Sequence, residues 1–179
     1  LVIHVAAVHS SAGSSYETVW QDMLAVNTAS VHVVLEYLRT QDPSARFVYA
    51  SSGKVFSPVD GVLTETSPMH PTCLYSLTKI STQDLIEIYR RKHGLSASVV
   101  YLFNHESERR PPHFFTSKVV TALAGALAGA RPETEVESLD FYCDWGGASE
   151  YMEIMVDIAE QVVDDDFVLG RGVTWLGRE

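Results

Sequence analysis

Short apolar runs alternate with long helical segments over the first 103 residues, and this alternation constrains the fold more than any other feature. Residues 1–7, 46–52 and 98–103 have the length and apolar composition of buried strands. Residues 19–38 and 71–93 lie between them and carry apolar side chains at helical spacing. Strands and helices in this order predict parallel βαβ units with right-handed crossovers, which defines an α/β fold.

Further elements are predicted after residue 103. Residues 114–128 read as an Ala-rich helix, residues 151–163 as an amphipathic helix and residues 166–170 as a short strand. The chain therefore continues to combine helices and strands beyond the third strand.

One pair of residues in the second long helix indicates a reaction. Tyr75 and Lys79 share a helical face, so the Lys79 ammonium can favour the ionised form of the Tyr75 phenol. A phenolate is a usable base at neutral pH. Ser52, at the end of the preceding strand, could hold the hydroxyl that loses its proton. These residues predict oxidation of an alcohol, and because no side chain can accept the hydride, they imply a nicotinamide cofactor, NAD or NADP.

The pair alone is weak evidence, because Tyr and Lys at this spacing also occur as an exposed helical pair without chemistry. The surrounding order is more specific. An apolar strand ends in Ser51 and Ser52, a loop with three prolines follows, and the helix then carries the pair. Ligands of parallel sheets bind at the carboxyl ends of the strands, where Ala6, Ser52 and Asn104 all fall.

The sequence resembles the extended short-chain dehydrogenase/reductase family, the NAD(P)-dependent epimerases and dehydratases of nucleotide sugars. Residues 1–7 look like the fourth strand of that family, and Asn27 sits where the family has an Asn in the next helix. Residues 102–110, which include Asn-His-Glu-Ser, residues 115–118, and residues 144–151, which begin Asp-Trp-Gly, are most similar to the GDP-mannose 4,6-dehydratases within it. The resemblance covers nearly the whole chain.

The resemblance implies a fold and a domain division. Residues 1–103 would be the C-terminal part of an NAD(P)-binding Rossmann domain, a Rossmann-like parallel sheet lacking its N-terminal strands. Residues 104–179 would be part of a smaller α/β substrate-binding domain. The family's first three strands and its glycine-rich loop would precede Leu1.

The resemblance also implies a role for each site residue. The implied catalytic residues are Ser52, Tyr75 and Lys79, the cofactor-binding residues are Ala6, Ala7, Tyr75, Lys79 and Phe103, and the substrate-binding residues are Asn104 and Lys118. Lys79 would contact both Tyr75 and the nicotinamide ribose. For the two substrate-binding residues an alternative stays open: Asn104 could cap a turn, and Lys118 could be an exposed helix charge.

Several positions depart from the family pattern. Lys54 stands in the place of a Glu that helps the family's dehydratases to eliminate water, and a protonated amine cannot be that base. Glu65 or Glu106 are candidate substitutes. Cys143 and Ser149 occupy places where the family has Arg residues that clamp a substrate diphosphate, so weaker binding of a GDP-sugar is expected.

The predicted function is an NAD(P)-dependent oxidoreductase like the nucleotide-sugar dehydratases and epimerases, which oxidises a sugar C4 hydroxyl. The elimination step stays open. The alternative is a non-catalytic relative, either a nucleotide- or sugar-sensing module or a degenerate subunit. Family members commonly pair through two long helices, so the resemblance predicts a homodimer through residues 19–38 and 74–92.

Composition argues against several other classes of protein. A hydrophobic content of 46% indicates a globular chain, and a formal charge of −10 argues against a nucleic-acid partner. Cys73 and Cys143 are too few for a disulfide framework or a Cys-x-x-Cys metal site, so no metal is predicted. No apolar run has the length of a membrane span. We therefore expect a cytoplasmic protein without a membrane partner.

Overall fold

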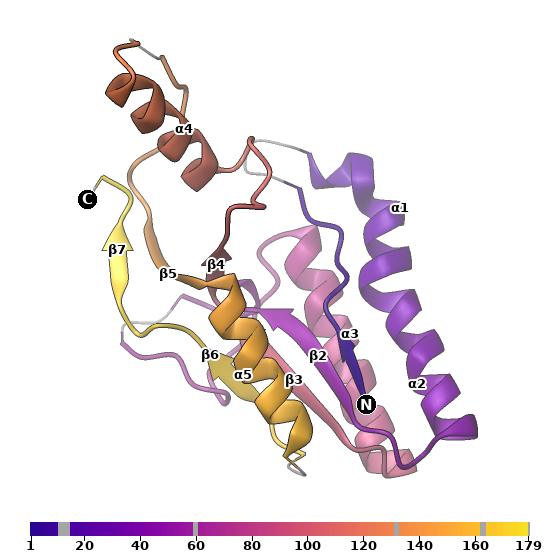
Figure 1. The fold of residues 1–179 in the computed structure, drawn as a ribbon. Helices are drawn as coiled ribbons and strands as arrows, with labels where there is room; N and C mark the ends of the chain where they lie inside the picture. The colour runs from indigo at the N-terminus through magenta and orange to yellow at the C-terminus, as the bar shows by residue number, and fades with distance from the viewer. Residues whose placement is uncertain (11–14, 59–60, 131–132, 162–163, 179) are drawn as a thin grey trace.

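A parallel sheet of four strands forms the centre of the molecule (Figure 1). The computed structural model describes residues 1–10, 15–58, 61–130, 133–161 and 164–178. Strands β1, β2, β3 and β6 lie side by side in that order, each parallel to its neighbour. Their bounds are Val2–His4, Phe47–Ser52, Ala97–Leu102 and Phe167–Leu169. The predicted α/β fold with a parallel sheet is confirmed.

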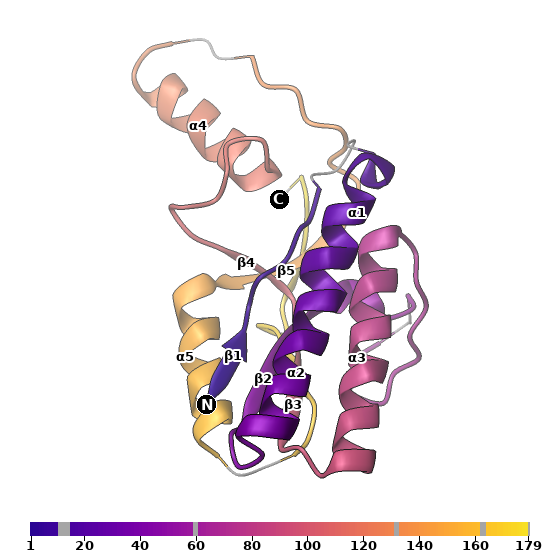
Figure 2. The same ribbon diagram turned by 90° about the vertical axis from the view of Figure 1, so that its right-hand side faces the viewer.

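Helices cover both faces of this sheet (Figure 2). After a 3-10 turn, α1 (Trp20–Met23), a π-helical turn (Leu24–Ala29) and α2 (Ser30–Gln41) form one continuous rod beside α3 (Leu74–His93). Helix α5 (Ala148–Glu160) lies on the opposite face, against β1, β2 and β3. Within the described ranges, no helix combines the length and apolar character needed to cross a bilayer.

Each face of the sheet has its own apolar core. Side chains alternate along a strand, so β2 and β3 contribute to both cores and are buried on both faces. The core under α2 and α3 includes Val31, Leu35, Leu38, Phe47, Tyr49, Ile86, Tyr89, Val99 and Tyr101. The core under α5 includes Val48, Ala50, Val100, Leu102, Tyr151, Met155 and Ile158.

Helix α3 has a defined beginning and end. Cys73 is its N-cap: its sulfur accepts a hydrogen bond from the Ser76 N–H at 3.5 Å, and the Ser76 hydroxyl accepts one from the Cys73 N–H at 3.1 Å. After the last helical residue, Gly94 adopts a left-handed conformation (φ 65°) that glycine tolerates best. The predicted range 71–93 started too early, because the chain before the cap is extended.

A second, smaller sheet follows residue 103. Strand β4 (Asn104–Glu106) pairs in parallel with β5 (Tyr142–Gly147), which pairs antiparallel with β7 (Thr174–Leu176). These strands were not predicted, because two of them have only three residues and none shows a clear apolar alternation. Helix α4 (Phe115–Leu127) extends away from both sheets (Figure 1).

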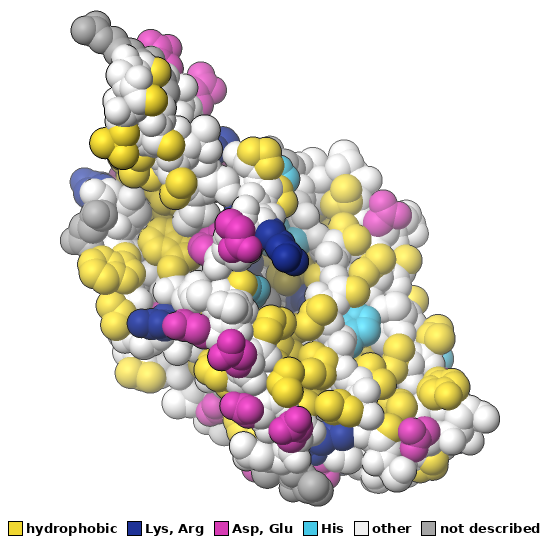
Figure 3. Space-filling view, viewed as in Figure 1, with side chains coloured by type: hydrophobic (Ala, Val, Ile, Leu, Met, Phe, Trp, Pro, Cys, Tyr) yellow, Lys and Arg dark blue, Asp and Glu magenta, His cyan; other side chains and the backbone are white. Residues whose placement is uncertain are grey.

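Hydrophobic side chains gather on the surface of α4 (Figure 3). Val120 is 64% exposed, Leu123 60% and Leu127 91%. The Ala-rich segment therefore forms the predicted helix, but these apolar side chains stay exposed among the described residues.

Residues beyond 103 contribute to both sheets. Strand β6, predicted at residues 166–170, pairs with β3, and α5 packs on the parallel sheet. Helix α5 begins before the predicted range 151–163, and residues 162–163 lie outside the described residues. Residue 103 thus marks where the chain first leaves the parallel sheet, not where that sheet is complete.

Strand β1 is an edge strand of the parallel sheet. Leu1 is 62% exposed and Val5 is 55% exposed, so the sheet presents apolar side chains on that side. Among the described residues, no strand pairs with the outer side of β1.

The side chain of Asn27 joins the segment after β1 to the helices. Its Oδ1 accepts a hydrogen bond from the Val8 N–H at 2.7 Å, and its Nδ2 donates to the Val8 carbonyl at 3.0 Å and to the Thr78 hydroxyl at 3.1 Å. Asn27 is fully buried. Since the family resemblance placed an Asn here, this structural role gives that position a physical reason.

We expect Asn27→Ala to lower the free energy of unfolding by about 2–4 kcal/mol, because it leaves the Val8 N–H and carbonyl without their partner and removes the bond to Thr78, whose hydroxyl keeps its bond to the Tyr75 carbonyl. Chemical denaturation followed by circular dichroism measures the change. Asn104→Ala is the matched control, because Asn104 is exposed and should shift the free energy of unfolding by less than about 0.5 kcal/mol. Equal effects of the two substitutions would contradict the role of Asn27.

Candidate active site

The structure brings together the three residues predicted to be catalytic. Ser52 ends β2, and Tyr75 and Lys79 lie in the first turns of α3. Ser52 is near enough to the Tyr75 phenol to act on its pKa. The Lys79 ammonium donates to the Ala50 carbonyl at 2.8 Å and lies 5.7 Å from the centre of the Tyr75 ring. All three groups therefore meet at the carboxyl end of β2.

The electrostatics of this group differ from the prediction. Burial raises the pKa of Tyr75 to about 12, although Ser52 acts to lower it. Burial also lowers the pKa of Lys79 to about 7, so its ammonium is only partly charged at neutral pH. The Tyr75 pKa is therefore raised and not lowered as predicted, because desolvation of the phenol is the largest influence on it.

His9 lies at the same edge, and the sequence analysis missed it. Its ring contacts the edge of the Tyr75 ring, with centroids 4.5 Å apart, and stacks on Phe114 at 6.3 Å. His9 follows the Ala6-Ala7 segment at the carboxyl end of β1. The rule that placed Ala6 at the ligand-binding edge could therefore have found His9 three residues further on.

Tyr16 and Cys73 complete the surroundings of His9. The Tyr16 hydroxyl lies 3.2 Å from His9 Nε2, and Cys73 is near enough to act on the pKa of Tyr16. Burial, followed by the effect of Cys73, raises the pKa of Tyr16 to about 12. Tyr16 is thus a neutral phenol that links the imidazole to the N-cap of α3.

Cations surround His9 on several sides. Burial is the largest cause that lowers the pKa of His9 to about 4, and the charges of Lys54, Arg110 and Lys79 lower it further. Arg110 also lies over the Phe114 ring, 4.3 Å from its centre. The imidazole is therefore neutral at pH 7.

The predicted cofactor-binding residues lie around this edge. Ala6 and Ala7 are exposed after β1. Phe103 is half-buried and packs on Gly53, where an added Cβ would come within 3.2 Å of the Phe103 ring. A larger residue at position 53 would displace that ring.

Two polar groups at the carboxyl end of β2 have capacity for a ligand. Within the described part of the chain, the buried Ser51 hydroxyl has no hydrogen-bond partner, and Lys79 donates only to Ala50 although an ammonium carries three N–H donors. The Ser51 hydroxyl and the unused N–H donors of Lys79 suit the hydroxyls of a nicotinamide ribose, and the exposed Ala6-Ala7 segment lies at the same edge. The residues present therefore fit the implied cofactor.

The predicted substrate-binding residues lie further out. Asn104 is exposed at the start of β4. Lys118 lies in the first turns of α4, and its ammonium donates to the Glu135 carbonyl at 3.2 Å. The structure does not bring Lys118 into contact with Ser52, Tyr75 or Lys79 among the described residues.

Neither glutamate considered as a substitute base is free in this structure. Glu65 accepts a hydrogen bond from the Val168 N–H at 2.7 Å, which holds it beside β6. Glu106 forms a bidentate ion pair with Arg110, at 2.7 Å and 3.0 Å. The described residues also contain no group of three His, Cys, Asp or Glu side chains that could hold a metal ion.

The parallel sheet, with a Ser-Tyr-Lys set at its carboxyl edge, defines an extended short-chain dehydrogenase/reductase. The chain belongs to the GDP-mannose 4,6-dehydratase family, whose family model matches residues 1–179. A GDP-mannose 4,6-dehydratase of Sordaria araneosa is 32% identical over 174 residues, which cover 96% of this chain and 32% of that protein. The chain thus spans about a third of that relative's length.

Solved structures share the fold. The structure of RMD from Pseudomonas aeruginosa complexed with NADPH has a TM-score of 0.85 at 20% identity, covering 98% of this chain and 61% of that one. The UDP-glucose 4-epimerase of Thermus thermophilus, in complex with NAD, has a TM-score of 0.77 at 20% identity, covering 98% and 58%.

We predict that Lys79→Met removes a pH dependence of stability. In the folded protein Lys79 has a pKa of about 7 and in the unfolded chain about 10.5, so between these values the unfolded chain binds one more proton. Stability from this group therefore rises with pH across that window, by at most about 1.4 kcal/mol per pH unit.

The measurement compares unfolding free energies of the wild type and Lys79→Met from pH 7.5 to pH 9.5, because the difference between them cancels groups that titrate in both. Lys92→Met, at the exposed end of the same helix, is the matched control. A wild-type minus Lys79→Met difference that does not change with pH would show that the buried ammonium keeps its charge.

Proposed function

We propose that the protein carrying this chain is an NAD(P)-dependent oxidoreductase that oxidises the C4 hydroxyl of a nucleotide-linked sugar, as the first step of a dehydration or an epimerisation. The observation that carries the proposal is the placement of Ser52 at the end of β2 and of Tyr75 and the buried Lys79 at the start of α3, where Lys79 donates to the Ala50 carbonyl of β2. These groups come from two elements and converge at the edge of the sheet where ligands of this fold class bind.

Each of the three residues has a defined task in this proposal. When bound, NAD(P)+ would supply the hydride acceptor that the side chains lack. Ser52 would hold the C4 oxygen, and Tyr75 would take its proton. Lys79 has unused N–H donors for a ribose hydroxyl, and its residual positive charge would favour the phenolate. Because burial opposes ionisation of Tyr75, the rate should rise toward alkaline pH.

The substrate class rests on relatives and neighbours. The family is named for a dehydratase of GDP-mannose, and a solved structure of the same fold has UDP-glucuronic acid and NAD bound. Asn104 is exposed at the first residue of β4 and could reach the sugar, with Lys118 toward the nucleotide. Cys143 and Ser149 stand where Arg residues would clamp a diphosphate, so a GDP-sugar should bind more weakly here.

A non-catalytic role is the second candidate, and the raised pKa of Tyr75 is the observation that favours it. A site whose phenol stays neutral could bind a cofactor or a nucleotide sugar without reaction. The two functions differ in whether cofactor is reduced.

We expect Tyr75→Phe to abolish most of the reduction of NAD+ or NADP+ by a nucleotide sugar, by about 10²- to 10⁴-fold, because it removes the group that takes the C4 proton. Absorbance of the reduced nicotinamide in a single turnover of the full-length protein measures the rate. Tyr37→Phe, on the exposed face of α2, is the matched control and should react like the wild type.

Cofactor binding is followed in parallel by the shift in thermal unfolding. A wild-type protein that is stabilised by NAD+ or NADP+ but never reduces either would favour the non-catalytic role. A Tyr75→Phe variant as active as the wild type would overturn the assignment of Tyr75.

We also propose that the protein pairs with a second copy through α2 and α3. Both helices expose large apolar side chains away from the sheet: Val33 is 66% exposed and Tyr37 60% on α2, and Leu77 is 41% and Ile88 39% on α3. Such faces of adjacent helices favour helix-to-helix contact with another chain.

We expect the double variant Val33→Glu, Tyr37→Glu to sediment as a monomer under conditions in which the wild type sediments as a dimer, because two carboxylates would be buried without partners. Analytical ultracentrifugation measures both. Val62→Glu, at a site 90% exposed in a loop, is the control and should leave the dimer intact. A monomeric wild type at high concentration would refute the proposal.

A further inference from the structure

His9 occupies an enclosed position directly beside the proposed base. Its imidazole packs edge-on against Tyr75 at 4.5 Å, edge-on against Tyr16 at 5.8 Å and stacked on Phe114 at 6.3 Å between ring centres. Three aromatic rings from three segments thus fix its orientation. The residue is half-buried, so part of it remains accessible to solvent.

The contact with Tyr16 is the basis for assigning the tautomer of His9. We assign the proton of the neutral ring to Nε2, because the Tyr16 oxygen lies 3.2 Å away and can accept it. This assignment leaves Nδ1 with a lone pair, and within the described residues Nδ1 has no hydrogen-bond partner.

Burial, assisted by nearby cations, keeps this imidazole neutral in the resting protein. Lys54, Arg110 and Lys79 all disfavour its charged form, and burial does so more strongly. With a pKa of about 4, the basicity of His9 is close to that of an ordinary glutamate, about 4.3. Nδ1 is therefore available as a proton acceptor at neutral pH.

The proposed oxidation creates a need for a second base at this place. Tyr75 takes the proton of the C4 hydroxyl, and the resulting ketone makes the neighbouring C–H bonds acidic. A base that removes such a proton must be distinct from Tyr75 and close to it. Glu65 and Glu106 are held elsewhere by their own partners, and Lys54 is a cation.

We infer that His9 is a catalytic residue that removes the C5 proton of the 4-keto sugar and so carries out the elimination of water, with Tyr16 as its positioning residue. This inference rests on the proposed function, because it needs the 4-keto sugar. It also favours a dehydratase over an epimerase, since inversion at C4 requires no base at C5.

The elimination balances without any further oxidant. His9 Nδ1 takes the C5 proton, and the electron pair of the C5–H bond becomes the second bond between C5 and C6. The C6–O bond breaks, and the departing hydroxide takes the proton back from His9 and leaves as water. His9 returns to its neutral form, and the hydride removed from C4 stays on the cofactor until it is used at C6.

The test follows oxidation and elimination separately in the full-length protein. GDP-mannose, UDP-glucose and dTDP-glucose are each incubated with NAD+ or NADP+ in D2O. Reduced nicotinamide reports oxidation at C4, and deuterium at C5 of the product, measured by NMR, reports proton removal by the protein.

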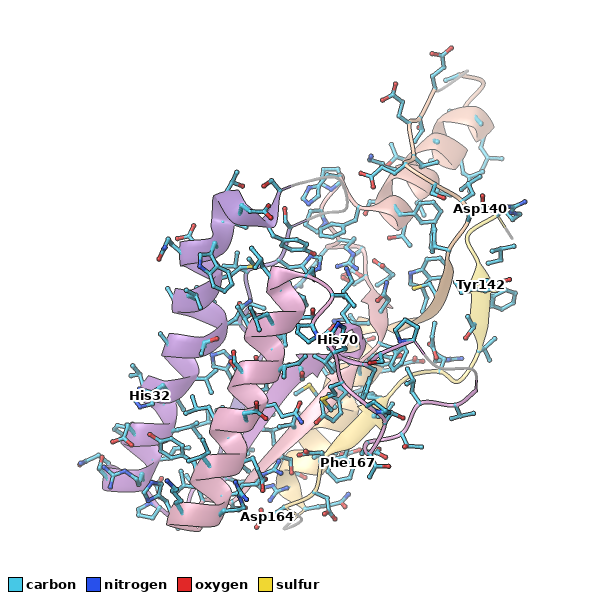
Figure 4. The ribbon with its side chains drawn as sticks, turned by 180° about the vertical axis from the view of Figure 1, so that it is seen from behind. His32, His70, Asp140, Tyr142, Asp164 and Phe167 are labelled. Carbon is cyan, nitrogen blue, oxygen red and sulfur yellow. The ribbon has the colours of Figure 1, made fainter. Side chains whose placement is uncertain are left out.

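We expect His9→Asn to accumulate reduced cofactor and to lower the incorporation of deuterium at C5 by about 10²-fold or more relative to the oxidation of C4 by the same variant. Tyr16→Phe should lower the C5 rate to a smaller extent with little change in KM, because it loosens the imidazole without removing it. His32→Asn is the matched control, because His32 is an exposed histidine on α2 (Figure 4).

Each outcome decides something. Equal deuterium at C5 in His9→Asn and the wild type would overturn the role of His9. Oxidation by the wild type without any deuterium at C5 would overturn the inference and leave the proposed function intact, whereas no oxidation of any sugar would overturn both. If His9→Asn does not fold, judged by circular dichroism, His9→Gln replaces it, because its longer amide can still donate to Tyr16.

Discussion

The buried amide of Asn27 is the interaction on which the site depends. The segment after β1 has no regular structure over residues 5–10, so its own backbone pattern does not determine where it lies. Asn27 bonds both the N–H and the carbonyl of Val8 and also reaches Thr78 in α3. Because His9 follows Val8 and Tyr75 lies one turn before Thr78, this one side chain brings the imidazole against the phenol.

Burial, which holds the site together, also sets its chemistry. Lys79 is 2% exposed beneath the Tyr49 and Tyr75 rings, and its ammonium anchors α3 to the Ala50 carbonyl of β2. The cost is that Lys79 is easily deprotonated and Tyr75 is hard to ionise. A site preorganised in this way is stable in its neutral state, and it gains charge only when ligands provide hydrogen bonds to the charged forms.

The strands and helices that could be predicted are those with long periodic patterns. Residues 46–52 and 98–103 are buried on both faces and therefore show continuous apolar runs, and the spacing of Tyr75 and Lys79 on α3 placed them correctly beside Ser52. The three-residue strands β4 and β7 were missed, because their pairing depends on partners distant in sequence. The direction of the shift in the Tyr75 pKa was missed, because spacing reveals which groups are neighbours but not how deeply they are buried. His9 was missed because its role depends on Asn27 and Phe114, which the fold alone brings near it.

The charges around His9 give a reason why the site could act only on a bound substrate. The chain carries a formal charge of −10, yet Lys54, Arg110 and Lys79 all bear on this imidazole. A nucleotide sugar carries a diphosphate, and an anion near Lys54 or Arg110 would offset the cationic effects that lower the pKa of His9. The imidazole would then be a stronger base in the complex than in the free protein. Lys54, which cannot itself accept the C5 proton, would in this way couple the arrival of the substrate to the strength of the base that does.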